Sequence, residues 1–113
     1  MGISTHVLDT SLGRPASGLP VDLEWQSSVG NWELVATSET DSDGRCQDLI
    51  PRGTAVSPGS YRLRFVTEEY FGKVQAEGLY PEVTVTFVVR DPSAHYHIPL
   101  LLSPNGHTTY RGS

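Results

Sequence analysis

The sequence is poor in cysteine and in clustered positive charge, and both shortages exclude classes of protein. Its 113 residues include one cysteine, Cys46, so no internal disulfide can form and no oxidising compartment is implied. The net charge is −5 and no run of Lys and Arg occurs, which disfavours nucleic acid because its phosphates need clustered cations. No apolar run approaches the length of a membrane span, so no membrane partner is expected.

Signals for export and for nucleotide chemistry are missing as well. The first residues contain no basic stretch followed by an apolar one, so the cytosol is the expected compartment, with a peroxisomal or exported location left open. No Gly-rich phosphate loop, cysteine pair or nucleophile elbow is present. The apolar content of 37% still suffices for the core of a single domain over residues 1–113.

The sequence does contain many short segments typical of β-strands. Strand-forming runs, most of them with alternating apolar and polar residues, cover 21–26, 32–36, 61–65, 83–89 and 96–102. Turn-forming residues separate these runs, as at 28–31 and 41–44. Residues 68–78 resemble a short helix that ends at Gly78. The pattern predicts an all-β sandwich with one short helix. Because Pro99 has no backbone N–H, its strand is expected at a sheet edge or unpaired on that side.

The histidines are the first candidates for chemistry, since imidazole transfers protons near neutral pH. Val7 should face the core, which puts His6 on the outer face of its strand. In the run 96–102 the same alternation puts His95 and His97 on the outer face. If both strands belong to one sheet, the imidazoles can meet on its outer surface. The alternative interpretation is a set of solvated surface histidines.

A metal site is another interpretation of the same residues. His95 and His97 share one strand face, and His6 could be a third ligand, as in catalytic zinc sites. No Asp or Glu lies within that strand to orient the imidazoles, so neither a metal nor a cofactor is expected. His107 follows a turn and is expected to be an ordinary surface residue.

Three further residues have both a functional and a plain structural interpretation. Arg45 follows a tight turn and could direct its donors at an anion, although an exposed turn arginine is the plainer interpretation. Cys46 has no activating partner in the sequence and is expected to be a small apolar filler. Asp9 could orient His6, but the role of a turn former is favoured.

The end of the sequence contains strand-forming residues almost to its last position. Residues 108–113 therefore predict a docked final strand rather than a frayed end. Tyr110 would contribute a phenol that donates a hydrogen bond, and Ser113 a hydroxyl and the terminal carboxylate.

Four segments together resemble the transthyretin-like family, in its hydroxyisourate hydrolase branch. They are THVLD with GRPA (5–9 and 13–16), DGR (43–45), HYHIPLLLSP (95–104) and YRGS (110–113). The similarity extends over essentially the whole chain. In the hormone carriers of the same family the terminal segment is replaced, and the equivalents of His6, Arg45 and His97 differ.

The resemblance implies a fold, an assembly and an activity. The fold is a transthyretin/prealbumin-like eight-stranded β-sandwich with one short helix. The assembly is a homotetramer, a dimer of dimers, in which outer sheet faces meet around a central channel. The activity is hydrolysis of 5-hydroxyisourate to 2-oxo-4-hydroxy-4-carboxy-5-ureidoimidazoline in urate degradation, without metal or cofactor.

The resemblance also implies roles for particular residues. His6 and His97 would transfer protons, Arg45 would hold the urate-like ring, and Ser113 would donate a hydrogen bond or fix the terminal segment. Tyr110, with His6 and Arg45, would bind the substrate. Three alternatives remain: a carrier of small aromatic ligands, a structural sandwich without a site, and a three-histidine zinc hydrolase.

Overall fold

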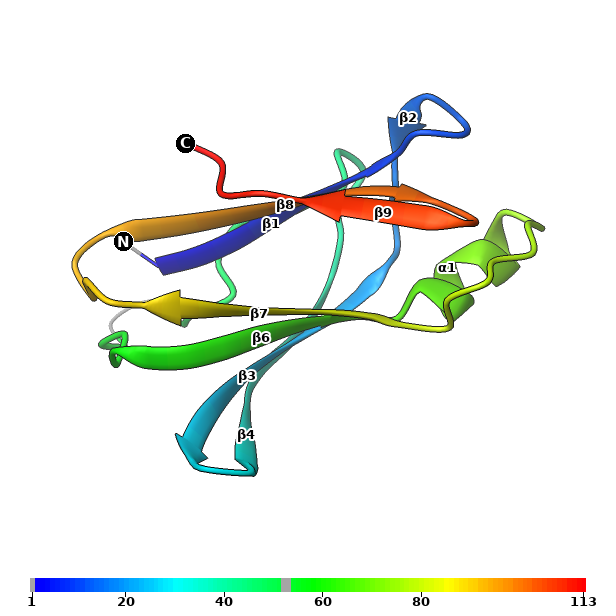
Figure 1. Cartoon of the computed structure of the whole chain (residues 1–113). Helices are drawn as coiled ribbons and strands as arrows, with labels where there is room; N and C mark the ends of the chain where they lie inside the picture. Colours follow the sequence, from blue (N-terminus) through cyan, green and yellow to red (C-terminus); the bar gives the residue numbers. More distant parts are fainter. Residues whose placement is uncertain (1, 52–53) are drawn as a thin grey trace.

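Two β-sheets packed face to face make up this computed structural model, which describes residues 2–51 and 54–113 (Figure 1). The first sheet contains β1 (Gly2–Asp9), β2 (Arg14–Pro15), β5 (Arg45–Cys46), β8 (His95–Ser103) and β9 (Gly106–Thr109). Its order is β2-β1-β8-β9, and β5 pairs with β1 beside β2. The second sheet, in the order β4-β3-β6-β7, contains β3 (Pro20–Ser28), β4 (Asn31–Glu39), β6 (Gly59–Phe65) and β7 (Val83–Val89).

The short strands β2 and β5 explain how the strand count agrees with the expected fold. Both pair with β1, β2 at Leu8 and Asp9 and β5 at Thr5 and His6, while β8 pairs along the whole of β1. In the described ranges, the nine strands therefore fill eight positions in the two sheets. The prediction of an all-β, eight-stranded sandwich with one short helix is confirmed.

The pairing of β1 with β8 is parallel, whereas the other ladders are antiparallel. β8 lies between β1 and β9, so it is not an edge strand, and the structure has the other expected arrangement, in which Pro99 is left unpaired on one side. The ladder with β9 begins at Leu100, and the Pro99 carbonyl instead accepts a hydrogen bond from Thr109 Oγ1 at 2.8 Å. Pro99 thus lies just outside the ladder in which its missing N–H would be needed.

The core lies between the two sheets and follows the predicted alternation. In β1, Val7 is fully buried while His6 and Leu8 are half-buried on the other face. In β8, alternate residues from Tyr96 to Leu102 are buried against the second sheet. The largest fully buried side chains of the core include Ile3, Val7, Val21, Leu23, Leu63, Phe65 and Leu100. Each stabilises the fold by about 1.5–3 kcal/mol through removal of apolar surface from water.

The helix α1 (Thr67–Lys73) is shorter than the 68–78 segment that the sequence predicts. It ends because Gln75 adopts a left-handed conformation with φ of 57°. The N–H of Ala76 then bonds to the Phe71 carbonyl and that of Gln75 to the Gly72 carbonyl, which is the Schellman pattern of helix termination. No helix of the described ranges is long and apolar enough to cross a membrane.

Candidate functional site

The strand register brings polar side chains together on the outer face of the first sheet. His6 on β1 lies opposite Arg45 on β5. On the other side of β1, Ser4 lies opposite His97 of β8. Because residues two apart on a strand share a face, Ser4 and His6 project to the same side. The outer face therefore holds two imidazoles, a guanidinium and a hydroxyl from segments far apart in the sequence.

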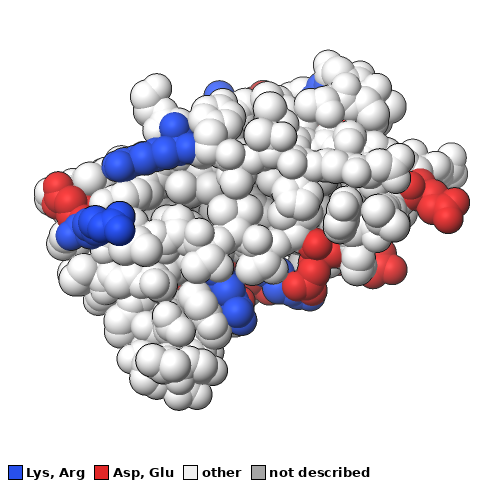
Figure 2. All heavy atoms as spheres, viewed as in Figure 1, with Lys and Arg blue, Asp and Glu red and all other residues white. Residues whose placement is uncertain are grey.

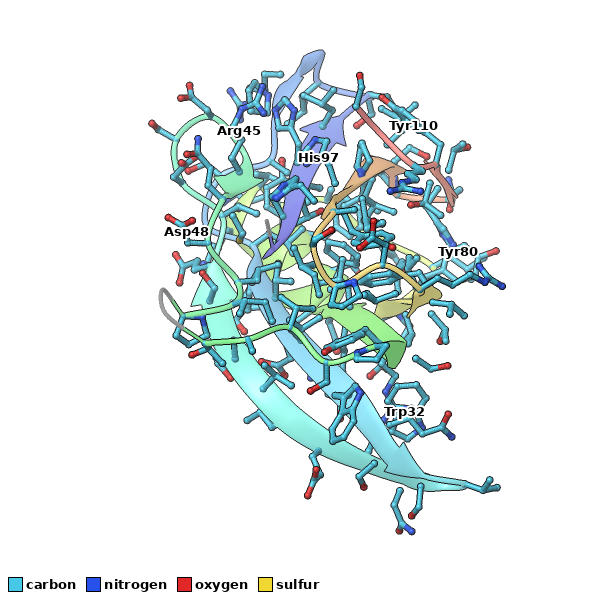
Figure 3. All side chains as sticks on the ribbon, turned by 90° about the vertical axis from the view of Figure 1, so that its left-hand side faces the viewer. Trp32, Arg45, Asp48, Tyr80, His97 and Tyr110 are labelled. Carbon is cyan, nitrogen blue, oxygen red and sulfur yellow. The ribbon has the colours of Figure 1, made fainter. Side chains whose placement is uncertain are left out.

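These side chains border an open cavity of about 320 Å³. It is lined by Ser4, Thr5, Arg45, Gln47, Asp48, His95, His97 and Ser113. Figure 3 shows Arg45 and His97 close together at one end of the molecule, with Asp48 nearby and Trp32 far away on the other sheet. His6 does not line the cavity itself but lies beside Arg45 at its margin.

The turn before β5 fixes where Arg45 emerges. The Asp41 carboxylate accepts hydrogen bonds from the backbone N–H of Asp43 and of Arg45, both at 2.9 Å. Gly44 has a positive φ of 77°, and a Cβ at this position would collide with the Val7 carbonyl. Glycine is therefore required here, both for the backbone conformation and for the close approach to β1. This geometry sets the Arg45 guanidinium beside the imidazoles.

The hydrogen bond of His6 defines which ring nitrogen carries its proton. His6 Nε2 lies 2.8 Å from the carbonyl oxygen of Asp43. A carbonyl oxygen can only accept, so Nε2 must donate and the neutral ring keeps its lone pair on Nδ1. The same bond orients the ring toward the Arg45 side of the site.

His97 is held from two directions. Its Nδ1 lies 2.7 Å from Ser4 Oγ, and its carbonyl accepts a 2.8 Å hydrogen bond from Gly112 N–H. The ring packs on Gly112 so closely that a Cβ there would lie 2.6 Å from His97 Cδ2. Burial, the charge of Arg45 and the neighbouring imidazoles lower the pKa of His97. The ring is therefore neutral at neutral pH and can accept a proton.

Unlike His6, which lies at the margin of this cavity, Tyr110 lies away from it in the single chain. It is 55% exposed and lines a second groove of about 310 Å³ with residues of β7 and β8. Figure 3 shows it on the far side of the terminal segment from Arg45. Ser113, three residues further along, lines the first cavity.

Two other residues have the structural roles that the sequence indicates. Cys46 is buried, and burial raises the pKa of its thiol, as expected of an apolar filler. The Asp9 carboxylate accepts hydrogen bonds from the backbone N–H of Ser11 and Leu12 at 3.0 Å, which confirms the turn-forming role. Asp9 also accepts a 2.6 Å bond from the Tyr70 hydroxyl and so links β1 to the helix.

Sequence reasoning did not single out Ser4, Gln47 or Asp48, although all three line the cavity. Alternation carries a signal for two of them, because Ser4 shares the outer face of β1 with His6, and Gln47 follows Arg45 by two residues. No pattern points to Asp48, which comes from the irregular segment after β5. In the two described ranges no cluster of three or more His, Cys, Asp or Glu side chains is suited to a metal ion.

The fold and the cavity define a class of protein, a β-sandwich with a histidine- and arginine-lined site on the outer face of one sheet. Residues 3–112 match the model of the HIUase/Transthyretin family. The chain is 43% identical over 112 residues to a mouse protein named 5-hydroxyisourate hydrolase, covering 98% of this chain and 94% of that one. The chain belongs to the HIUase/Transthyretin family.

Solved structures from both branches of the family match the fold. The 5-hydroxyisourate hydrolase of Klebsiella pneumoniae superposes with a TM-score of 0.84 at 32% identity, covering 98% of this chain and 92% of that one. Sea bream transthyretin, solved in complex with thyroxine, gives a TM-score of 0.90 at 28% identity, with coverages of 99% and 95%. Because the backbones of a carrier and of an enzyme both match closely, the side chains of the cavity must distinguish the two functions.

Proposed function

We propose that this protein hydrolyses 5-hydroxyisourate to 2-oxo-4-hydroxy-4-carboxy-5-ureidoimidazoline in urate degradation. The observation that carries the proposal is the convergence of His97, Arg45 and Ser113 on one small cavity with His6 at its margin. Ring opening by water needs a base for the water, a cation for the developing oxyanion and a proton for the departing nitrogen. This set of side chains can supply all three.

We assign the role of general base to His97. Its pKa is lowered, first by burial and then by Arg45 and the neighbouring imidazoles, so its neutral form predominates near pH 7. Nδ1 is engaged by Ser4, which leaves Nε2 for the substrate side of the ring. As Nε2 takes a proton from water, the water oxygen forms a bond to the acyl carbon. The C–N bond of the ring then breaks, and the departing nitrogen takes the proton that Nε2 had received from water.

Arg45 and His6 are assigned to substrate binding and charge stabilisation. The planar guanidinium offers paired N–H donors that suit the carbonyl oxygens of a urate-like ring. Its fixed charge beside the cavity would also stabilise the oxyanion of the tetrahedral intermediate. His6, whose Nε2 is occupied by the Asp43 carbonyl, presents Nδ1 and can orient the ring or relay a proton to the departing nitrogen. Ser113 would donate a hydrogen bond to the substrate.

The role proposed for Tyr110 depends on the proposed homotetramer. The strands β7 and β9 are edge strands of the two sheets. Figure 2, which views the molecule from the side of these two strands, shows few charged side chains on this surface. Unpaired edges of this kind favour symmetric pairing between copies of one chain. In a dimer of dimers, the exposed Tyr110 could reach a site on another subunit. Sedimentation of the purified protein tests the assembly, and a monomer would remove this role.

The alternative is a carrier of small aromatic ligands, favoured by the backbone similarity to sea bream transthyretin. An enzyme would convert 5-hydroxyisourate repeatedly, whereas a carrier would only bind a ligand. Urate oxidase can generate 5-hydroxyisourate in place, and its decay can be followed by absorbance with and without this protein. Accelerated decay in proportion to protein concentration, unaffected by dialysis against a chelator, supports hydrolysis by side chains. Binding without acceleration would reject the enzyme and favour the carrier.

A further inference from the structure

The Ser4 hydroxyl that contacts His97 also contacts His95, a link that the proposed mechanism does not use. Ser4 Oγ lies 2.7 Å from His95 Nε2 and 2.7 Å from His97 Nδ1. The register explains the arrangement, since Gly2 and Ser4 of β1 pair with His95 and His97 of β8. Ser4 is 6% exposed, whereas His95 is open to solvent. The three side chains form a continuous hydrogen-bonded chain along one wall of the cavity, from His97 to the solvent-exposed His95.

One proton on the hydroxyl couples the protonation of the two rings. A serine hydroxyl has one proton, so it can donate to only one of the two imidazole nitrogens. If Ser4 donates to His97, neutral His97 carries its proton on Nε2 and cannot act as a base there. If Ser4 donates to His95, neutral His97 carries its proton on Nδ1 and has a lone pair on Nε2.

The surroundings of the cavity favour the second arrangement. Arg45 lines the same cavity as His97, and a guanidinium has N–H donors and no acceptor. A lone pair on Nε2 can accept a hydrogen bond from such a donor, whereas an Nε2–H could not pair with the guanidinium. In this arrangement His95 Nε2 accepts from Ser4, and the proton of neutral His95 lies on Nδ1.

Given the proposed function, we propose that Ser4 and His95 are positioning residues that hold His97 in its Nδ1–H tautomer, with Nε2 as the base. When Nε2 takes a proton from water, the Nδ1–H bond to Ser4 persists and the Ser4 bond to His95 persists. No hydrogen bond is broken as charge develops on the ring. The path also ends at a solvent-exposed imidazole that can exchange a proton with water.

Nitrogen NMR of the protein labelled with ¹⁵N-histidine reads the tautomer directly, because protonated and unprotonated ring nitrogens differ widely in chemical shift. At mildly alkaline pH, wild-type His97 should be protonated on Nδ1 and unprotonated on Nε2. Ser4→Ala should populate the other tautomer and lower kcat about 10–100-fold with KM within about threefold. Ser4→Thr retains the hydroxyl and should restore both the tautomer and most of kcat.

His95→Phe provides a second variant at an exposed position, in case Ser4→Ala does not fold. It removes the acceptor and should shift the His97 tautomer and lower kcat in the same direction. His107→Phe, an exposed histidine on β9, is the matched control and should change neither. A wild-type His97 protonated on Nε2 would overturn the inference, as would an unchanged tautomer and kcat in His95→Phe. The NMR measurement needs no turnover, so it decides this inference even if hydrolysis is not found.

Discussion

His6 and Arg45 lie directly opposite each other across the β1–β5 ladder, so both side chains leave the sheet on the same outer face. Paired positions on adjacent strands have Cβ atoms about 4.5–5.5 Å apart. The antiparallel pairing of this two-residue strand joins residue 6 to residue 45, and hydrogen bonds from His6 Nε2 to the Asp43 carbonyl and from Val7 N–H to the Gly44 carbonyl support it. The site accordingly depends on the Asp41–Gly44 turn that delivers β5 to the edge of β1.

Arg45→Ala should weaken substrate binding more than it weakens the fold. The guanidinium lies at an open cavity and makes no ion pair in the described structure, so its removal leaves no buried charge uncompensated. We expect KM to rise about tenfold or more, from the loss of a charged hydrogen bond of about 1.5–3 kcal/mol. Steady-state kinetics measures the change, and Arg14→Ala is a control outside the cavity. Unchanged KM and kcat would reject the binding role.

The pH dependence of kcat/KM should reflect the lowered pKa of His97. Burial first, then Arg45 and the other imidazoles, disfavour its protonation. The neutral base therefore persists to lower pH, and activity should fall only below the ordinary histidine value of about 6.5. Arg45→Gln removes one of these causes and should raise the pKa of His97, so the acidic limb of the kcat/KM profile should move to higher pH. If kcat/KM of the wild type fell with a midpoint above the ordinary histidine pKa of about 6.5, the assignment of His97 as the base would be contradicted.

Gly112→Ala should impair activity although it adds a single methyl group. The new Cβ would lie 2.6 Å from His97 Cδ2 and 3.2 Å from Pro99 Cγ, so the ring or the terminal segment must shift. A displacement near 1 Å at a catalytic group can reduce the rate about 10²-fold. Gly106→Ala is the matched control, since its Cβ would meet nothing closer than 3.8 Å. Equal kcat in the two variants would show that the terminal segment does not position His97.

Asp9→Asn should destabilise the protein without affecting the site. Asp9 is 1% exposed and accepts hydrogen bonds from Ser11, Leu12 and Tyr70. Weakening this network should lower the free energy of unfolding by about 3 kcal/mol. Urea denaturation measures this, with Glu33→Gln on exposed β4 as the control for loss of a carboxylate. A variant as stable as wild type would contradict the structural role.

The stability that Asp9 supplies should depend on pH in a defined direction. Burial raises the pKa of this carboxyl, but the hydrogen bonds from Tyr70, Leu12 and Ser11 outweigh burial and the net pKa is lowered. The folded state therefore binds this proton less readily than the unfolded state. The stabilisation is fully present above the unfolded value near 3.9 and is lost as pH falls through the lower, folded value.

Alternation in the sequence was enough to place His6 and His97 on outer faces, because one buried face fixes which residues of a strand point outward. It could not give the orientation of β1 against β8, since alternation is the same for parallel and antiparallel neighbours. Alternation also does not fix the register, on which the meeting of Ser4 with both imidazoles depends. Of the two arrangements expected for Pro99, the edge strand is not found, because the strand around it pairs on both sides and only Pro99 itself stays outside the ladder with β9.

The placement of Tyr110 and the end of the helix were also beyond the sequence pattern. Strand-forming residues predict that 108–113 docks, but not which side of the terminal segment faces the cavity. The helix ends early because Gln75 takes a left-handed conformation. A non-glycine residue rarely adopts this conformation, and no sequence pattern predicts it here. Both features depend on packing between segments distant in sequence.

The most direct test of the account compares the catalysed decay of 5-hydroxyisourate for wild type, His97→Asn and His6→Ala at equal concentration. Circular dichroism and Tm establish that each variant is folded, and His107→Asn controls for the loss of an imidazole elsewhere on the first sheet. We expect kcat to fall about 10²–10⁴-fold in His97→Asn and in His6→Ala, with the control unchanged. Folded variants that both keep kcat within about threefold of wild type would contradict a hydrolytic site built on these two histidines.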